Sequence, residues 1–316
     1  MSNILITAIG SFSADVVIER LKKEGHNIIG CDIYPKDWIA NSLSVNKFYQ
    51  APYVTDKEKY LNFLKVICKE EQINYLIPLT DVEVDVINAN RELFINTIIC
   101  LSAKESIEIC RNKYSLYKFL KSQNIECLIP TGLLSDVSLE NIKYPVVIKP
   151  YNGRSSQGLN YIESKSELEI FLNKNHADNY VIQPKVLGRI ITVDVLRNNS
   201  FFVATARAEL LRTLNGAGTS VTVFFDEYLW DTCKEIAERL NIIGCVNFEF
   251  IQINEHEYKF LECNPRFSGG VAFSCMAGYD YVCNHLKCYS KEKPDEFFEI
   301  HEMTIARKYR EYITKG

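Results

Sequence analysis

A carboxylate, an amide and a guanidinium occupy every second position of the stretch ECNPR within FLECNPRFSGG, residues 260–270. They belong to Glu262, Asn264 and Arg266, and Pro265 and two closing glycines interrupt or end the pattern. Side chains two apart in a strand share a face, so Glu262 and Asn264 are predicted to point the same way. Such a set on one face suggests a charged ligand or a metal ion.

A second carboxylate is predicted to join this face from the preceding strand. The runs CVNFEFIQI and YKFLECN, separated by the polar turn NEHE, predict a β-hairpin. Glu249 lies in its first strand, between Phe248 and Phe250, which face the other side. Two carboxylates and an amide oxygen suit Mg²⁺ or Mn²⁺. A solvated polar face beside a chance Asn-Pro turn is the alternative that these residues alone leave open.

A glycine-containing loop follows the predicted strand VVIKP, which delivers Lys149. Between Gly153 and Gly158 the loop holds Arg154, Ser155, Ser156 and Gln157. Small residues let backbone N–H groups approach phosphate oxygens, and the lysine adds positive charge. The loop is not a P-loop, because its lysine precedes the glycines. Taken alone, a β-hairpin with a flexible tip is the favoured alternative.

These features together are the parts of a nucleotide site. Lys113, at the start of a predicted helix ahead of the loop, is a further cation. The five histidines are far apart in the sequence, so a Ser-His-Asp set is not indicated. Phosphoryl transfer needs none, because positioning and charge neutralisation can supply most of the rate.

The composition is that of an ordinary globular chain. Its 316 residues, 47% hydrophobic and 24% charged, suffice for two or three domains. The net charge of −4 argues against general binding to nucleic acid or membrane surfaces. The N-terminus MSNILITAIG lacks the basic segment of a signal peptide, and the eleven cysteines are scattered singly. We therefore expect a cytoplasmic protein with reduced cysteines and with neither nucleic-acid nor membrane partners.

Three regions must position these residues. Residues 1–102 alternate strand and helix signals, which predicts a Rossmann-like domain. Gly10 and Asp32 end its first two strands, but AIGSFSAD has one glycine where a dinucleotide fingerprint needs three, so a structural turn is preferred to NAD binding. Residues 103–183 hold the glycine loop, and residues 184–316 begin with a predicted hinge and hold the hairpin.

In this order the motifs resemble the ATP-grasp superfamily, in particular its carbamoyl-phosphate-synthase-like and amino-acid ligase branches. The matching stretches are NKYSLYKFL, VVIKP with its glycine loop, VIQPKVLG, NGAGTSVTV and FLECNPRFSGG. The resemblance implies an α/β (α+β) fold, in which a Rossmann-like N-terminal domain precedes a two-lobed ATP-grasp fold. The N-terminal lobe would carry the phosphate-binding lid and the C-terminal lobe the metal site.

The resemblance also implies a role for each matching residue. Lys113 and Lys149 would contact the nucleotide phosphates, beneath a mobile lid formed by Gly153–Gly158. The interlobe segment that holds adenine would consist of Gln183, Pro184, Lys185 and Val186. Two Mg²⁺ ions, with Mn²⁺ as an alternative, would bridge the triphosphate on Glu249, Glu262 and Asn264. Arg266 and Lys149 would be catalytic, with Arg266 stabilising the transferring phosphoryl group.

The implied activity is that of an ATP-dependent carboxylate–amine or carboxylate–thiol ligase. A small-molecule carboxylate would form an acyl phosphate and ADP, and the amine or thiol would then displace phosphate. Arg207, Arg212 and Gly269 are candidates for contacting an anionic substrate, although a surface salt bridge explains the arginines equally well. The alternative function is a non-catalytic nucleotide-binding or sensor protein. The resemblance also implies a homodimer, although less strongly than it implies the ligase activity.

One departure from the family concerns ribose. Many relatives carry a glutamate two or three residues after the glycine that is Gly188 here, whereas this chain has Ile190 and Ile191. Asp194 lies further along the same predicted strand, on the face of Ile190. Our hypothesis is that Asp194 supplies the polar contact near the nucleotide or a metal-bound water, and that ribose recognition is weaker than usual.

Overall fold

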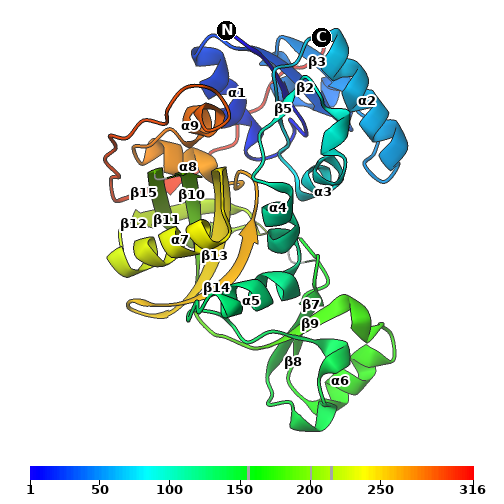
Figure 1. Cartoon of the computed structure of the whole chain (residues 1–316), viewed down its shortest axis with the longest axis vertical. Coiled ribbons are helices and arrows are strands. Elements are labelled where there is room, and N and C mark those ends of the chain that lie inside the picture. The colour runs from blue at the N-terminus through cyan, green and yellow to red at the C-terminus, as the bar shows by residue number, and fades with distance from the viewer. Residues whose placement is uncertain (155–156, 200, 214–215) are drawn as a thin grey trace.

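The computed structural model describes residues 1–154, 157–199, 201–213 and 216–316. Its strands form three sheets, of five, four and six strands. The six-stranded sheet lies between the other two along the long axis, and both chain ends lie beside the N-terminal sheet (Figure 1). None of the helices in these ranges is both long and apolar enough to cross a bilayer.

The N-terminal sheet is parallel, with strand order β3-β2-β1-β4-β5. Its strands are β1 (Asn3–Ile6), β2 (Asn27–Asp32), β3 (Lys47–Gln50), β4 (Tyr75–Ile77) and β5 (Ile98–Ile99). The connecting helices are α1 (Ala14–Lys23), α2 (Lys57–Glu70) and α3 (Asp81–Ala89). In α1 the residues at helical spacing, Val16, Val17 and Leu21, are buried against the sheet. The predicted Rossmann-like arrangement is confirmed.

Asp32, at the end of β2, is used by the backbone. Its carboxylate accepts hydrogen bonds from the Gly10 N–H at 2.8 Å and from the Tyr34 N–H at 3.1 Å. A Cβ on Gly10 would lie 3.0 Å from Asp32 Oδ2, which explains the glycine. These contacts agree with a structural turn rather than a dinucleotide site.

The four-stranded sheet is antiparallel, with strand order β6-β9-β7-β8. Its strands are β6 (Gly132–Leu133), β7 (Val146–Pro150), β8 (Asn160–Ile162) and β9 (Tyr180–Pro184), and α6 (Lys165–Leu172) covers it. Ile148, Ile182 and Phe171 belong to its own small core. This sheet presents Lys149 and the glycine loop.

The six-stranded sheet is antiparallel, with strand order β14-β13-β10-β11-β12-β15. Its strands are β10 (Arg189–Asn198), β11 (Phe201–Arg212), β12 (Gly218–Phe224), β13 (Gly244–Asn254), β14 (Glu257–Asn264) and β15 (Met303–Ala306). The helices α7 (Glu227–Arg239), α8 (Val271–Met276) and α9 (Tyr281–Lys287) pack around it. Short 3₁₀ turns elsewhere cover Lys36–Trp38, Ala40–Leu43, Arg91–Leu93, Leu134–Asp136, Leu139–Asn141 and Ala177–Asn179.

Two helices, α4 (Lys104–Arg111) and α5 (Lys113–Ser122), connect the sheets. Leu116 and Leu120 of α5 are buried in the same core as Phe248 and Phe260 of the six-stranded sheet. Helix α5 therefore packs on the C-terminal sheet, although it lies in the predicted N-terminal lobe. The domain boundaries after residues 102 and 183 stay predictions.

Gly188 connects β9 and β10 where no side chain fits. A Cβ at Gly188 would lie 2.2 Å from the Gln252 carbonyl oxygen. We expect Gly188→Ala to lower the free energy of unfolding by about 1–3 kcal/mol, because the backbone must shift. Urea unfolding measures this loss. The control Leu187→Ala, at a side chain that is 75% exposed, should change little, and equal stability of both variants would contradict the steric account.

Candidate functional site

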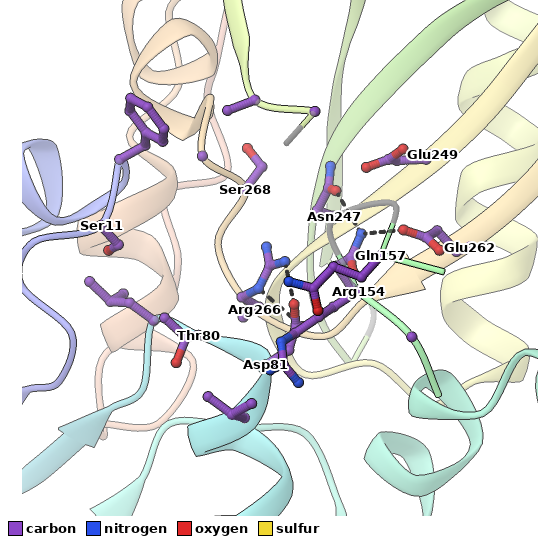
Figure 2. A pocket seen from close by; sticks show the side chains of 18 of the residues that line it. Ser11, Thr80, Asp81, Arg154, Gln157, Asn247, Glu249, Glu262, Arg266 and Ser268 are labelled. Atoms are coloured by element: carbon purple, nitrogen blue, oxygen red, sulfur yellow. Dashed lines mark hydrogen bonds and ion pairs between the residues drawn. The ribbon is translucent and has the colours of Figure 1, made fainter. Parts of the chain in front are cut away.

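A cleft of about 1330 Å³ lies where the three sheets meet. The N-terminal sheet contributes Ser11 and Thr80, the four-stranded sheet contributes Lys149, and the six-stranded sheet contributes Glu249 and Glu262. Figure 2 shows Glu249 and Glu262 on one side of this space and Ser11 and Thr80, from the N-terminal loops, on the other. The cleft brings together most of the residues predicted from sequence.

The predicted metal-binding face is assembled by the β13–β14 hairpin. Glu249 lies directly opposite Glu262, and Asn247 lies opposite Asn264. The Asn264 amide donates to Glu262 Oε1 and to Asn247 Oδ1, both at 3.3 Å (Figure 2). Sequence reasoning missed Asn247, although its position two residues before Glu249 places it on the same face.

The two carboxylates have opposite pKa shifts. Burial and the negative charge of Glu262 raise the pKa of Glu249. Burial would also raise the pKa of Glu262, but Lys113 and Lys149 outweigh it, and that pKa is lowered. The two half-buried carboxylates face one another, so cations beside them stabilise the pair. A hard divalent cation fits this oxygen donor set.

Two lysines from different elements converge on Glu262. Lys113 Nζ lies 3.2 Å from Glu262 Oε2 and donates to the Gly153 carbonyl at 2.8 Å. Asn112 caps the start of α5 and so fixes the position of Lys113. Lys149 is nearly buried, and burial lowers its pKa to about 8 despite the opposing effect of Glu262. Lys113 therefore contacts Glu262 directly, whereas Lys149 acts on it through its nearby charge.

The glycine loop begins at the cleft. The Gly153 N–H donates to the Pro150 carbonyl at 3.2 Å, and Gly158 has a φ of 70°. Arg154 and Gln157 line the cleft (Figure 2). The remaining loop members predicted to contact phosphate, Ser155 and Ser156, lie outside the described residues. The phosphate-binding role of this loop stays a prediction.

The predicted interlobe segment forms one wall of the cleft. Gln183, Pro184 and Val186 line it. The Gln183 side chain donates to Thr131 Oγ1 at 2.7 Å, whereas the Lys185 ammonium pairs with Glu163 at 2.6 Å. The apolar residues Ile190, Ile251 and Leu261 continue this wall and were missed by sequence reasoning. An apolar wall of this kind suits a planar base.

Asp194 does not reach the cleft, which corrects the hypothesis of a nucleotide contact. Its side chain is fully buried and accepts hydrogen bonds from Arg207 and Ser274. The Arg207 guanidinium, only 1% exposed, also contacts Ser274 and donates to Ser268 Oγ at 3.2 Å. Arg207 is therefore not a surface salt bridge; it also lines the cleft, and its contact with a substrate stays a prediction. The pair supports the loop that contains Ser268.

Arg212 and Gly269 both line the cleft. Arg212 Nε donates to the Gly216 carbonyl at 2.9 Å, and its Nη2 lies 3.8 Å from Glu249 Oε2. The Gly269 carbonyl accepts a hydrogen bond from Arg307 Nη2 at 2.7 Å. Arg307 also lies 5.0 Å from the centre of the Phe12 ring. The contribution of Phe12 from the N-terminal domain was not foreseen.

Arg266 is held by a residue of the N-terminal domain. Its Nε lies 3.1 Å from Asp81 Oδ1 and its Nη2 lies 2.7 Å from Asp81 Oδ2 (Figure 2). Sequence reasoning missed Asp81. The available signal was its place just after the strand that ends in the run LIPL, because ligand sites lie at the carboxyl ends of parallel strands.

Three family models match parts of the chain, and two of the matched ranges overlap. Residues 4–101 match "PylC-like, N-terminal domain" and residues 116–215 match "D-ala D-ala ligase C-terminus". Residues 176–310 match "ATP-grasp in the biosynthetic pathway with Ter operon".

Curated relatives include much longer proteins. Multifunctional protein pyr1-3 of Dictyostelium discoideum is 25% identical over 218 residues, which are 63% of this chain and 9% of that protein. The carbamoyl phosphate synthase large chain of Agathobacter rectalis is 28% identical over 145 residues, 42% of this chain and 14% of that protein. The match thus spans less than one sixth of either relative.

Solved structures share the fold at low sequence identity. Biotin carboxylase of Campylobacter jejuni, in a β-γ-ATP complex, gives a TM-score of 0.76 at 17% identity, covering 91% of this chain and 70% of that chain. The L-amino acid ligase of Bacillus licheniformis gives a TM-score of 0.74 at 15% identity, covering 92% and 74%.

The lowered pKa of Lys149 predicts how nucleotide affinity depends on pH. The ammonium is charged below about pH 8 and neutral above it, so its attraction for phosphate is lost as the pH rises through that value. We expect the affinity for Mg·ATP, measured by calorimetry, to fall by about tenfold between about pH 7 and pH 9. Lys149→Met should bind weakly at both pH values.

The control for this prediction is Lys47→Met, which removes a lysine that pairs with Glu71 and does not line the cleft. It should keep both the affinity and the pH dependence of the wild type. An unchanged pH dependence in Lys149→Met would show that another group causes it.

Proposed function

We propose that this chain, which belongs to the ATP-grasp superfamily, is an ATP-dependent, ADP-forming ligase that joins a carboxylate to an amine. The single observation that carries the proposal is the convergence of charged groups on one cleft. Glu249 and Glu262 face one another there, Lys113 and Lys149 approach Glu262, and Arg266 lies at the same opening.

In this proposal each wall of the cleft binds a different part of ATP. Lys113, Lys149 and Arg212 would contact the phosphates, because all three cations lie around the carboxylate pair. The apolar wall beside residues 183–186 would hold adenine. Two Mg²⁺ ions, or Mn²⁺, held by Glu249, Glu262 and Asn264 would neutralise the charge on the phosphates.

The reaction would proceed in two steps. The substrate carboxylate attacks the γ-phosphorus of ATP, and ADP leaves, so that an acyl phosphate forms. The amine then attacks the acyl carbon, and phosphate leaves with the bonding electrons. Arg266 would stabilise the charge on the transferring phosphoryl group. The loop from Gly153 to Gly158 would close over the intermediate and exclude water.

Glu209 favours an amine over a thiol as the nucleophile. It lines the cleft, and its Oε2 is buried without a hydrogen-bond partner among the described residues. Its carboxylate lies over Gly218, where a Cβ would come within 2.1 Å of Oε2. A buried carboxylate oxygen without a donor suits an ammonium group. Glu209 would bind the protonated amine and accept its proton before attack on the acyl phosphate.

The rival function, a non-catalytic nucleotide sensor, has no observation in its favour. The charged residues expected for catalysis are retained in the cleft. The homodimer expected from the family and the cytoplasmic location expected from the sequence remain part of the proposal.

Phosphate release tests the proposal directly. We expect ATP turnover to rise when the protein with Mg²⁺ receives defined pools of amino acids and other small carboxylates and amines. Glu262→Gln should reduce this turnover by about 10²-fold or more, because an electrostatic stabiliser is lost. Glu163→Gln, at an exposed carboxylate outside the cleft, is the matched control and should turn over normally. Tight ATP binding without stimulated turnover by any pool would favour the sensor.

Glu209→Gln tests the nature of the nucleophile. Loss of a charged hydrogen bond should raise the KM for the amine by about 10–100-fold, while the KM values for ATP and the carboxylate stay within about twofold. The control Glu227→Gln changes an exposed carboxylate at the start of α7. A proportional rise in all three KM values would assign Glu209 a structural role instead.

A further inference from the structure

Asp81 is the first residue of α3 and follows strand β4 of the N-terminal sheet. Its carboxylate binds the guanidinium of Arg266. Both carboxylate oxygens take part, at 3.1 Å from Nε and 2.7 Å from Nη2. The Asp81 side chain is 4% exposed and that of Arg266 is 18% exposed. This side-on, two-point contact fixes the plane of the guanidinium as well as its position.

A second arginine keeps Asp81 charged. Arg111 Nη1 lies 3.6 Å from Asp81 Oδ1, and Arg111 is itself held by both oxygens of Asp85, at 2.7 and 3.0 Å. Burial would raise the pKa of Asp81, but Arg266 and Arg111 outweigh it, so the pKa is lowered. Asp81 therefore remains a carboxylate while it holds Arg266.

The contacts of Arg266 leave part of its guanidinium for a ligand. An arginine has five N–H donors. Two of them meet Asp81, and Nη1 donates a third to the Phe267 carbonyl at 2.9 Å. Arg266 lines the cleft together with Glu249 and Glu262. Its remaining donors are thus held in a fixed direction beside the carboxylate pair.

We propose that Asp81 is a positioning residue for phosphoryl transfer, which it supports by orienting Arg266. Asp81 need not touch the nucleotide, because its effect passes through the guanidinium. The N-terminal domain would then take part in the chemistry of the C-terminal sheet. This inference rests on the proposed function, in which Arg266 stabilises the transferring phosphoryl group.

A purely structural clamp between domains would use the same ion pair, so the test must separate the two roles. The pair of Arg20 with Asp280, at 3.1 Å, provides a comparison. It joins α1 of the N-terminal domain to the start of α9 and lies away from the cleft. Arg20→Gln removes this link and leaves the Asp280 cap of α9 in place.

The experiment uses calorimetry to compare the affinity for Mg·ADP with the affinity for Mg·ADP plus aluminium fluoride. Aluminium fluoride mimics the phosphoryl group during its transfer. Wild type should bind the aluminium fluoride complex about 10²-fold or more tightly than Mg·ADP. Asp81→Asn should lose about tenfold or more of this preference, while its affinity for Mg·ADP stays within about twofold. Arg20→Gln should keep the wild-type preference.

A double-variant cycle identifies the route of the effect. If Asp81 acts through Arg266, Asp81→Asn combined with Arg266→Ala should lose no more preference than Arg266→Ala alone. Additive losses would overturn the proposal. So would a wild-type preference in Asp81→Asn, or equal loss of affinity for both ligands.

Two further outcomes keep the test decisive. If Asp81→Asn does not fold, the same binding measurement is made on the variant Arg266→Lys. A lysine keeps the positive charge but cannot make the two-point contact with Asp81. Full preference for aluminium fluoride in Arg266→Lys would overturn the role of Asp81. If wild type itself shows no preference, the proposed phosphoryl transfer fails, and the inference fails with it.

Discussion

The juxtaposition of two half-buried carboxylates is the constraint on which the cleft depends. Glu249 and Glu262 face each other across neighbouring strands, and such a pair is costly unless cations surround it. Lys113 comes from α5 and Lys149 from β7, so the charge balance requires both elements to pack against the C-terminal sheet. The lysines compensate Glu262 more than Glu249, and a divalent cation with a triphosphate would complete the balance.

The same constraint explains why the cleft needs all three sheets. The hairpin β13–β14 supplies the carboxylates, the four-stranded sheet supplies a lysine and a wall for a planar base, and the N-terminal sheet supplies Asp81. Arg266 alone would be a long, mobile side chain, and Asp81 gives it one orientation. In the proposed function, nucleotide binding, orientation of the phosphoryl group and selection of the amine would therefore depend on separate elements that meet at one opening.

Local periodicity explains which of these features could be predicted from sequence. The period of two placed Glu249, Glu262 and Asn264 on one face, and the pairing of β13 with β14 agrees. The same rule put Asp194 on a strand face but could not reveal that Arg207 of the next strand neutralises it. The contact of Arg266 with Asp81 spans 185 residues, and no local pattern encodes it. Strand β15 is short and pairs only at an edge, so its four residues gave little signal.

The most direct test of the central claim follows the oxygen atoms of the carboxylate substrate. Pools of amino acids and other carboxylic acids labelled with heavy oxygen in the carboxylate would be incubated with the protein, Mg²⁺ and unlabelled ATP, and the released phosphate analysed by mass spectrometry. An acyl phosphate requires one carboxylate oxygen to leave with the phosphate, so we predict phosphate that carries one heavy oxygen. Unlabelled phosphate would show that water attacks ATP instead, and it would contradict the ligase.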